Sequence, residues 1–370
     1  MTTTPPVPPP PDGLAEPRGP VAGTPDEATP DEATPDEEPE PFSDGPPPLP
    51  EPMLVLDGTL PPAPAPVADE PTADHGTCAR CGGAYDEEGW CTECGSRRPD
   101  PRHHFSARPA DHVAGVCDRG IRHEDNEDAM ALWADGDGRA AIVVCDGVTT
   151  ATRSAEASLA AADAALEVLV DGALAPPDRL VAATDAAAEA VEQVGRDFPD
   201  SAPSCTYVAA LVQDGTATVG SVGDSRAYWL PDDGEPLRLT TDDSVAEEQV
   251  QAGLDRQTAE AGPMGHTITR WLGPDSPDHA PDVTTQDVTA PGWLLLCSDG
   301  LWNYASEPRA LREVVRTLTR PTEGAPHTSS SSAALDLAQA LVEWANGRGG
   351  ADNITVALVR TPTGQDGTHG

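Results

Sequence analysis

The chain has 370 residues and a formal net charge of −41, and all 22 of its basic residues are arginine. This acidity disfavours nucleic acid or an anionic membrane as a partner, and the lack of lysine excludes a lysine nucleophile or Schiff base. No apolar run approaches the roughly 20 residues of a membrane span, and no signal peptide is visible in the first residues. A cytoplasmic protein from a high-GC bacterium is therefore expected.

Residues 1–76 form a proline-rich, acidic leader. Before Cys78 the chain holds 23 of its 41 prolines, and 16 acidic residues against one arginine. Such a segment cannot bury enough apolar surface to offset the entropy of ordering, so we expect it to be disordered. Its repeated Thr-Pro-Asp-Glu segments begin at Thr24, Thr29 and Thr34. If these threonines are phosphorylated, they could bind a phosphothreonine-binding module. The simpler interpretation is that the leader is a solvated spacer.

Residues 77–98 carry two Cys-x-x-Cys pairs, each followed by glycine. Four thiolates at this spacing are typical of a closed, tetrahedral Zn²⁺ site. A disulfide framework is the weaker alternative, because no secretion signal is present. We therefore predict a small zinc ribbon that folds around one structural Zn²⁺. Its ligands would be Cys78, Cys81, Cys91 and Cys94.

Residues 99–110 are polar and contain proline, and are expected to be a linker. From 111 to 361 the strand-like segments are grouped together, and so are the helix-like segments, which predicts an α+β fold with antiparallel sheets. Residues 362–370 are expected to be a disordered tail. The expected strands are 113–117, 129–133, 140–145, 207–213, 216–222, 226–230, 293–297 and 354–359, and the expected helices are 154–170, 178–194, 245–251, 309–318 and 333–344.

Acidic residues stand in turns beside the ends of several expected strands. Asp146, Asp224 and Asp299 each follow an apolar run, and Asp352 precedes one. A strand that stops at such a turn presents its carboxylate at the sheet edge. Converging carboxylates would repel one another without a cation, and oxygen-rich clusters suit Mg²⁺ or Mn²⁺. A single Asp-Gly is more often a plain turn, an interpretation that stays most open for Asp224 and Asp243.

Eight motifs follow one another between residues 111 and 361. They are Arg119-Gly120 with Asn126-Glu127-Asp128-Ala129, Cys145-Asp146-Gly147, Ser204-Cys205-Thr206, Gly223-Asp224-Ser225-Arg226, Leu239 to Ser244, Ile268 to Gly273, Ser298-Asp299-Gly300-Leu301 and Ala351-Asp352-Asn353. In this order and approximate spacing they resemble the metal-dependent serine/threonine phosphatases of the type 2C (PPM) family. The resemblance implies a four-layer α-β-β-α sandwich of two antiparallel sheets flanked by helices.

The resemblance also implies a binuclear Mn²⁺/Mg²⁺ site at one end of the sandwich. Asp146 would bridge both ions. Glu127 and the carbonyl of Gly147 would bind one of them, and Asp299 and Asp352 would bind the other. Water activated by the two ions would then attack the phosphorus directly, without a phospho-enzyme.

Four further residues are assigned through the resemblance or through a departure from it. Asp224 would contribute, with Asp299, to a weaker third ion, and Asp128 would orient metal-bound water. An arginine that binds the substrate phosphate often stands four residues before the metal-binding glutamate. Here that position is His123, preceded by Arg122. Either side chain could bind the phosphate.

The expected function is hydrolysis of phosphoserine and phosphothreonine on proteins, in reversal of a bacterial Ser/Thr kinase. Two or three Mn²⁺/Mg²⁺ ions and one structural Zn²⁺ are the expected cofactors, in a monomer whose ribbon and leader select partners. The alternative is a catalytically weak pseudophosphatase or scaffold, for which the histidine at position 123 is the sole support. A third possibility keeps the enzyme class but takes anti-sigma-factor antagonists as substrates.

Overall fold

The computed structural model describes residues 76–148, 151, 153–198, 201–320 and 333–362. The predicted leader up to residue 75, with its Thr-Pro repeat, lies outside the described residues, as does the predicted tail from residue 363. Within the described part of the chain, no helix combines the length and apolar character that crossing a membrane requires.

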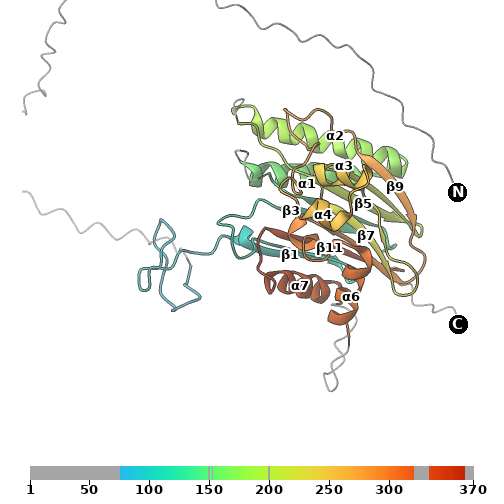
Figure 1. Cartoon of the computed structure of the whole chain (residues 1–370). Coiled ribbons are helices and arrows are strands. Elements are labelled where there is room, and N and C mark those ends of the chain that lie inside the picture. The colour runs from blue at the N-terminus through green and yellow to red at the C-terminus, as the bar shows by residue number, and fades with distance from the viewer. Residues whose placement is uncertain (1–75, 149–150, 152, 199–200, 321–332, 363–370) are drawn as a thin grey trace, which may run out of the picture. The chain divides into compact units, whose positions relative to one another are not determined.

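Two antiparallel sheets form the centre of the fold (Figure 1). The strand order is β1-β2-β11-β10-β7-β8 in one sheet and β3-β4-β5-β6-β9 in the other. The first sheet consists of β1 (His104–Ala110), β2 (Val113–Asp118), β11 (Ile354–Thr361), β10 (Gly292–Cys297), β7 (Arg226–Pro231) and β8 (Leu237–Arg238). The second consists of β3 (Ala129–Ala134), β4 (Ala140–Cys145), β5 (Tyr207–Gln213), β6 (Thr216–Val222) and β9 (Asp282–Asp287).

Helices cover the outer faces of both sheets (Figure 1). The five-stranded sheet packs against α1 (Ser154–Asp171) and α2 (Pro176–Gly195). The six-stranded sheet packs against α5 (Asp299–Trp302), α6 (Pro308–Leu318) and α7 (Ala333–Asn346). The short helices α3 (Val245–Gln251) and α4 (Arg256–Glu260) lie in the segment between β8 and β9. This arrangement confirms the predicted four-layer α-β-β-α sandwich.

Burial on both faces explains why the central strands are apolar throughout instead of alternating. In β4, Ile142 and Val144 join the cluster between the two sheets, whereas Ala141, Val143 and Cys145 face the cluster under α1 and α2. Successive side chains of a strand point to opposite faces, so both faces of β4 need apolar residues. The four cysteines that follow the ribbon are all buried, as the sequence predicts for small apolar side chains.

The expected linker at 99–110 is wrong for most of its length. It contains a short 3-10 helix, η1 (Pro101–His103), and strand β1, which pairs antiparallel with β2. β1 is an edge strand with largely exposed side chains, and it tolerates Pro109 for that reason. β1 was not predicted because its sequence is largely polar and shows no apolar face. The exposed edge strand β9 was not predicted for the same reason.

Candidate metal centre

Strand register places five of the sequence-predicted acidic residues at the same end of the two sheets. Ala129 pairs with Cys145 in one sheet, and Cys297 pairs with both Arg226 and Val356 in the other. Residues one to four positions beyond these pairs therefore gather at this end of the two sheets. They are Asp128 before β3, Asp146 after β4, Asp224 before β7, Asp299 at the start of α5, and Asp352 before β11.

Glycines allow the turns that carry these residues to approach closely. A Cβ atom on Gly300 would lie 1.9 Å from the carbonyl oxygen of Asn353, so only glycine lets the start of α5 meet the turn before β11. A Cβ atom on Gly147 would lie 2.7 Å from the carbonyl oxygen of Glu127. The amide of Gly147 donates to that same oxygen at 3.2 Å. The predicted ligands Glu127 and Gly147 are thus held together by their backbones.

The carboxylates act on one another electrostatically. Burial, followed by the charges of neighbouring aspartates, raises the pKa of Asp146 and Asp299 well above the ordinary range. Burial likewise raises the pKa of Asp128 and of Asp224 to about 7 each. Charged groups this close are stable only when protons or cations neutralise them. The all-oxygen donor set fits hard divalent ions such as Mn²⁺ and Mg²⁺.

Asp128 is fully buried and held from one side only. Its Oδ2 accepts hydrogen bonds from Ser298 Oγ and Thr355 Oγ1, each at 2.7 Å. Its buried Oδ1 has no hydrogen-bond partner among the described residues. An unpaired buried carboxylate oxygen is rare and calls for a ligand or water. Asp128 is therefore oriented with one acceptor atom unused.

The two candidate phosphate-binding residues point to different places. His123 Nε2 lies 3.2 Å from Asp352 Oδ1. Arg122 is exposed, and its guanidinium lies beside Gly349 and near the hydroxyl of Tyr304. A Cβ atom built on Gly349 would be 3.8 Å from Arg122 Nη2 and 3.6 Å from that hydroxyl. The structure therefore brings His123, and not Arg122, into contact with a predicted metal ligand.

Sequence reasoning missed a buried network around Arg226. The guanidinium donates to both carboxylate oxygens of Asp242 at 2.5 to 3.0 Å and to Glu260 Oε1 at 2.8 Å. It also stacks 3.6 Å from the ring centre of Trp302, whose Nε1 donates to the carbonyl of Asp224 at 2.9 Å. The network thus supports the turn that carries Asp224. The available signal was an arginine at the start of an otherwise apolar strand.

Asp243 serves the turn rather than the carboxylate cluster. Its Oδ2 accepts from the amide of Gly223 at 2.9 Å, and its Oδ1 accepts from Arg270 Nε at 2.8 Å. Arg270 also lies within 3.5 Å of Asp278 and within 3.4 Å of Asp282. Asp243 therefore holds the Gly223 turn in place, and Arg270 is an ion-pairing residue.

The four cysteines of the predicted ribbon form a second, separate donor set. All four Sγ atoms lie within 4.8 Å of one another, with Cys78 and Cys94 3.8 Å apart and Cys81 and Cys91 3.4 Å apart. A tetrahedral site with Zn–S bonds of about 2.3 Å places its sulfur atoms about 3.8 Å apart. No other three Cys, His, Asp or Glu side chains of the described residues come this close. The carboxylates of the metal centre are therefore spread more widely than the thiols.

Comparison with known proteins identifies the family. Residues 120–344 match the family model for protein phosphatase 2C. Protein phosphatase PhpP of Streptococcus pneumoniae is 29% identical over 252 residues, which cover 67% of this chain and 96% of PhpP.

Two solved structures extend the likeness to three dimensions. The PPM Ser-Thr phosphatase MsPP from Mycobacterium smegmatis, in complex with cacodylate, is 32% identical with a TM-score of 0.52, over 68% of this chain and 99% of that one. The catalytic domain of the serine threonine protein phosphatase PstP, in complex with 2 manganese ions, is 26% identical with a TM-score of 0.52. The match covers 70% of this chain and 97% of the PstP chain. The chain therefore belongs to the protein phosphatase 2C family of metal-dependent serine/threonine phosphatases.

Proposed function

We propose that this protein hydrolyses phosphoserine and phosphothreonine on other proteins, with two Mn²⁺ or Mg²⁺ ions held at the end of the sandwich. The observation that carries the proposal is the convergence of five mutually repelling carboxylates at the end of the two sheets. Family membership and the PstP structure with manganese support the choice of metal. Asp146, Glu127, Asp299, Asp352 and the Gly147 carbonyl would hold the two ions.

Two bound divalent ions would lower the pKa of a water molecule and neutralise charge on the phosphoryl oxygens. The chain itself positions the reactants. Asp128 is fixed through Oδ2 by Ser298 and Thr355, which leaves Oδ1 to accept a hydrogen bond from the attacking water. Cys145 directly precedes Asp146. Its thiol is buried and its pKa is raised well above the ordinary value, so it is no competing nucleophile.

Two further residues complete the proposed site. His123 donates to the substrate phosphate when protonated, because its Nε2 already faces the carboxylate cluster at Asp352. Asp224, together with Asp299, contributes to a weaker third ion. The pseudophosphatase alternative gains nothing here, since each acidic position that the resemblance assigns to metal or water holds a carboxylate.

Metal-dependent turnover tests this function. The full chain should release phosphate from a phosphothreonine peptide with Mn²⁺ present and far less from the matching phosphotyrosine peptide. EDTA should abolish the release, and added Mn²⁺ should restore it, because the attack relies on water activated by the metal ions. Equal turnover in EDTA, with the metal content measured, would contradict the proposal.

We also propose that the cysteine cluster binds one Zn²⁺ and that the ribbon and leader select protein partners, a cognate Ser/Thr kinase among them. The Sγ spacing supports zinc rather than a hard cation. We expect one zinc per chain by elemental analysis, lost in the double variant Cys91→Ser/Cys94→Ser. Local folding depends on the metal, so proteolysis should then cut within 77–98.

The catalytic domain should tolerate this loss. Manganese-dependent turnover of a short peptide should change less than about twofold, because no ribbon residue belongs to the carboxylate site. Thr92→Ser, placed between the two replaced cysteines, is the matched control and should keep its zinc. Retention of zinc by the double variant would rule the site out.

A further inference from the structure

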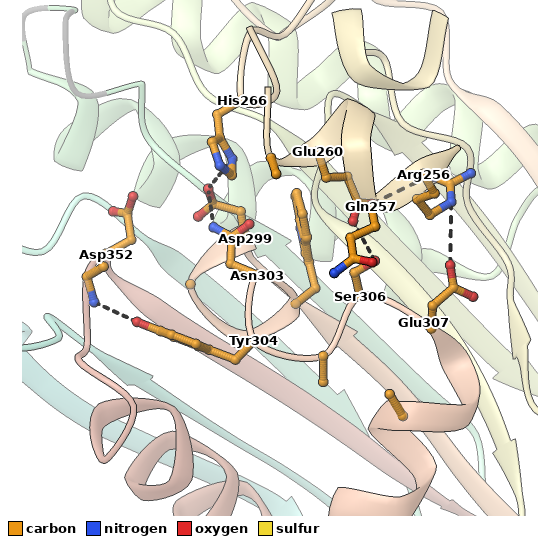
Figure 2. A pocket seen from close by; sticks show the side chains of 16 residues that line it. Arg256, Gln257, Glu260, His266, Asp299, Asn303, Tyr304, Ser306, Glu307 and Asp352 are labelled. Atoms are coloured by element: carbon orange, nitrogen blue, oxygen red, sulfur yellow. Dashed lines mark hydrogen bonds and ion pairs between the residues drawn. The ribbon is translucent and has the colours of Figure 1, made fainter. Parts of the chain in front are cut away.

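A groove of about 850 Å³ opens beside the candidate metal centre (Figure 2). Asp299 and Asp352 line one end of it. Toward the other end it runs between α4 and the segment that joins α5 to α6, and we call this part the α4 groove. Its walls are Arg256, Gln257 and Glu260 on one side and Ser306 and Glu307 on the other. A peptide whose phosphate sits at the metal centre can extend its neighbouring residues into this groove.

Most charges in the α4 groove are already paired within the protein. Arg256 donates from Nη1 and Nη2 to Glu247 at 2.8 and 3.2 Å. Glu260 accepts from buried Arg226 at 2.8 Å and from Ser306 Oγ at 2.7 Å. Neither Arg256 nor Glu260 therefore has a charge left to recognise a ligand, and an acidic substrate side chain would meet Glu247, Glu260 and Glu307 around Arg256.

Glu307 differs from these residues. Its side chain is 64% exposed, and the described residues offer it one ion pair, with Arg256 Nε at 3.7 Å. That distance is too long for a hydrogen bond, so both carboxylate oxygens keep their capacity to accept. Ala310, one turn along α6, is exposed beside it and lines the same groove. This combination suits the charged head and the apolar stem of an arginine or lysine side chain.

We propose that the α4 groove binds the substrate segment on one side of the phosphorylated residue, and that Glu307 selects a basic side chain there. The inference rests on the proposed phosphatase function and names its substrate class: phosphoproteins with arginine or lysine close to the phosphothreonine. The net charge of the whole chain, −41, acts in the same direction by attracting basic segments.

A peptide series tests the selection. In a neutral phosphothreonine peptide, Arg, Gln or Glu is substituted at one position at a time, within about four residues of the phosphothreonine. This range corresponds to roughly 14 Å of extended chain on either side. With the full chain and Mn²⁺, arginine at a position on one side should raise kcat/KM about three- to fivefold over glutamine, as an exposed ion pair would. Added salt should reduce this preference.

Variants assign the preference to Glu307. In Glu307→Gln the Arg-to-Gln ratio at that position should fall to about one, and in Glu307→Arg the ratio should invert. Glu313→Gln removes an exposed glutamate within α6, one paired with Arg316, and should keep the wild-type ratio. A ratio unaltered in Glu307→Gln, or a wild type that prefers Glu or shows no preference, would overturn the proposal. Mn²⁺-dependent turnover of the neutral peptide reports separately on the phosphatase function.

Discussion

Replacement of Asp146 with asparagine is expected to abolish phosphatase activity and, at the same time, to stabilise the metal-free protein. The activity should fall by at least two to three orders of magnitude, about the loss that follows removal of one preorganised electrostatic partner of a transition state. In EDTA at pH 8 the free energy of unfolding should rise by about 1–2 kcal/mol, because one of several repelling buried charges is gone. Initial rates and thermal unfolding measure the two effects.

The stability of the metal-free protein should also depend on pH, in a direction that the pKa shifts determine. The raised folded-state pKa values mean that the native site holds protons that the unfolded chain lacks. The stability of the metal-free wild type should therefore fall as pH rises from 5 to 8, through the pKa of about 7 of Asp128 and Asp224. Asp146→Asn should show a smaller fall, and Mn²⁺ should remove it in the wild type.

Asp137 provides the matched control for Asp146. It stands in another Asp-Gly turn, Asp137-Gly138, but it is exposed and far from the carboxylate cluster in the hairpin between β3 and β4. Asp137→Asn should change neither the activity nor the slope of stability with pH. An Asp146→Asn protein that unfolds more easily than the wild type in EDTA at pH 8 would contradict the electrostatic account.

Replacement of Arg226 with methionine is expected to cost about 3–5 kcal/mol of stability. The change keeps much of the side-chain volume but removes the guanidinium from the buried carboxylate of Asp242 and the partly buried one of Glu260, which is the costly way to break a buried ion pair. Activity should fall as well, because Trp302 loses the guanidinium stacked on it and supports Asp224 less firmly. Urea unfolding and Mn²⁺ titration of the turnover measure these losses.

Arg360 is the corresponding partly exposed arginine. It too pairs with an aspartate, Asp232, and stacks on a tryptophan, Trp293, but its side chain is 33% exposed. Arg360→Met should cost no more than about 1 kcal/mol, since solvent replaces the lost partner. Equal costs for the two arginine variants would show that the Arg226 network adds nothing through its burial.

The sequence predicted the parts of the fold that carry a strong local pattern. Both ends of β4 and of β5 follow from apolar runs closed by turn residues, and α2 begins two residues earlier than expected because Pro176 fits the first helical turn. β1 and β9 escaped prediction because an exposed edge strand shows no apolar face. Local pattern therefore identifies buried elements and passes over exposed ones.

Long-range contacts decide the details of the site, and the sequence carries no signal for them. Whether Asp243 belongs to a turn or to a metal depends on Gly223 and Arg270, which lie 20 and 27 positions away. The placement of His123 depends on Asp352, at the other end of the domain. The α4 groove likewise exists only because α4 and the start of α6 come together.

Strand β1 determines where the chain can be cut. It covers the edge of β2, and Arg102 in the preceding η1 donates to the carbonyls of Asp128 and Ala155 at 3.0 and 2.6 Å. A fragment that starts at residue 111 would expose a row of unpaired backbone groups along an apolar strand, which favours aggregation. A soluble, active fragment therefore has to begin at or before Asp100, directly after the cysteine cluster.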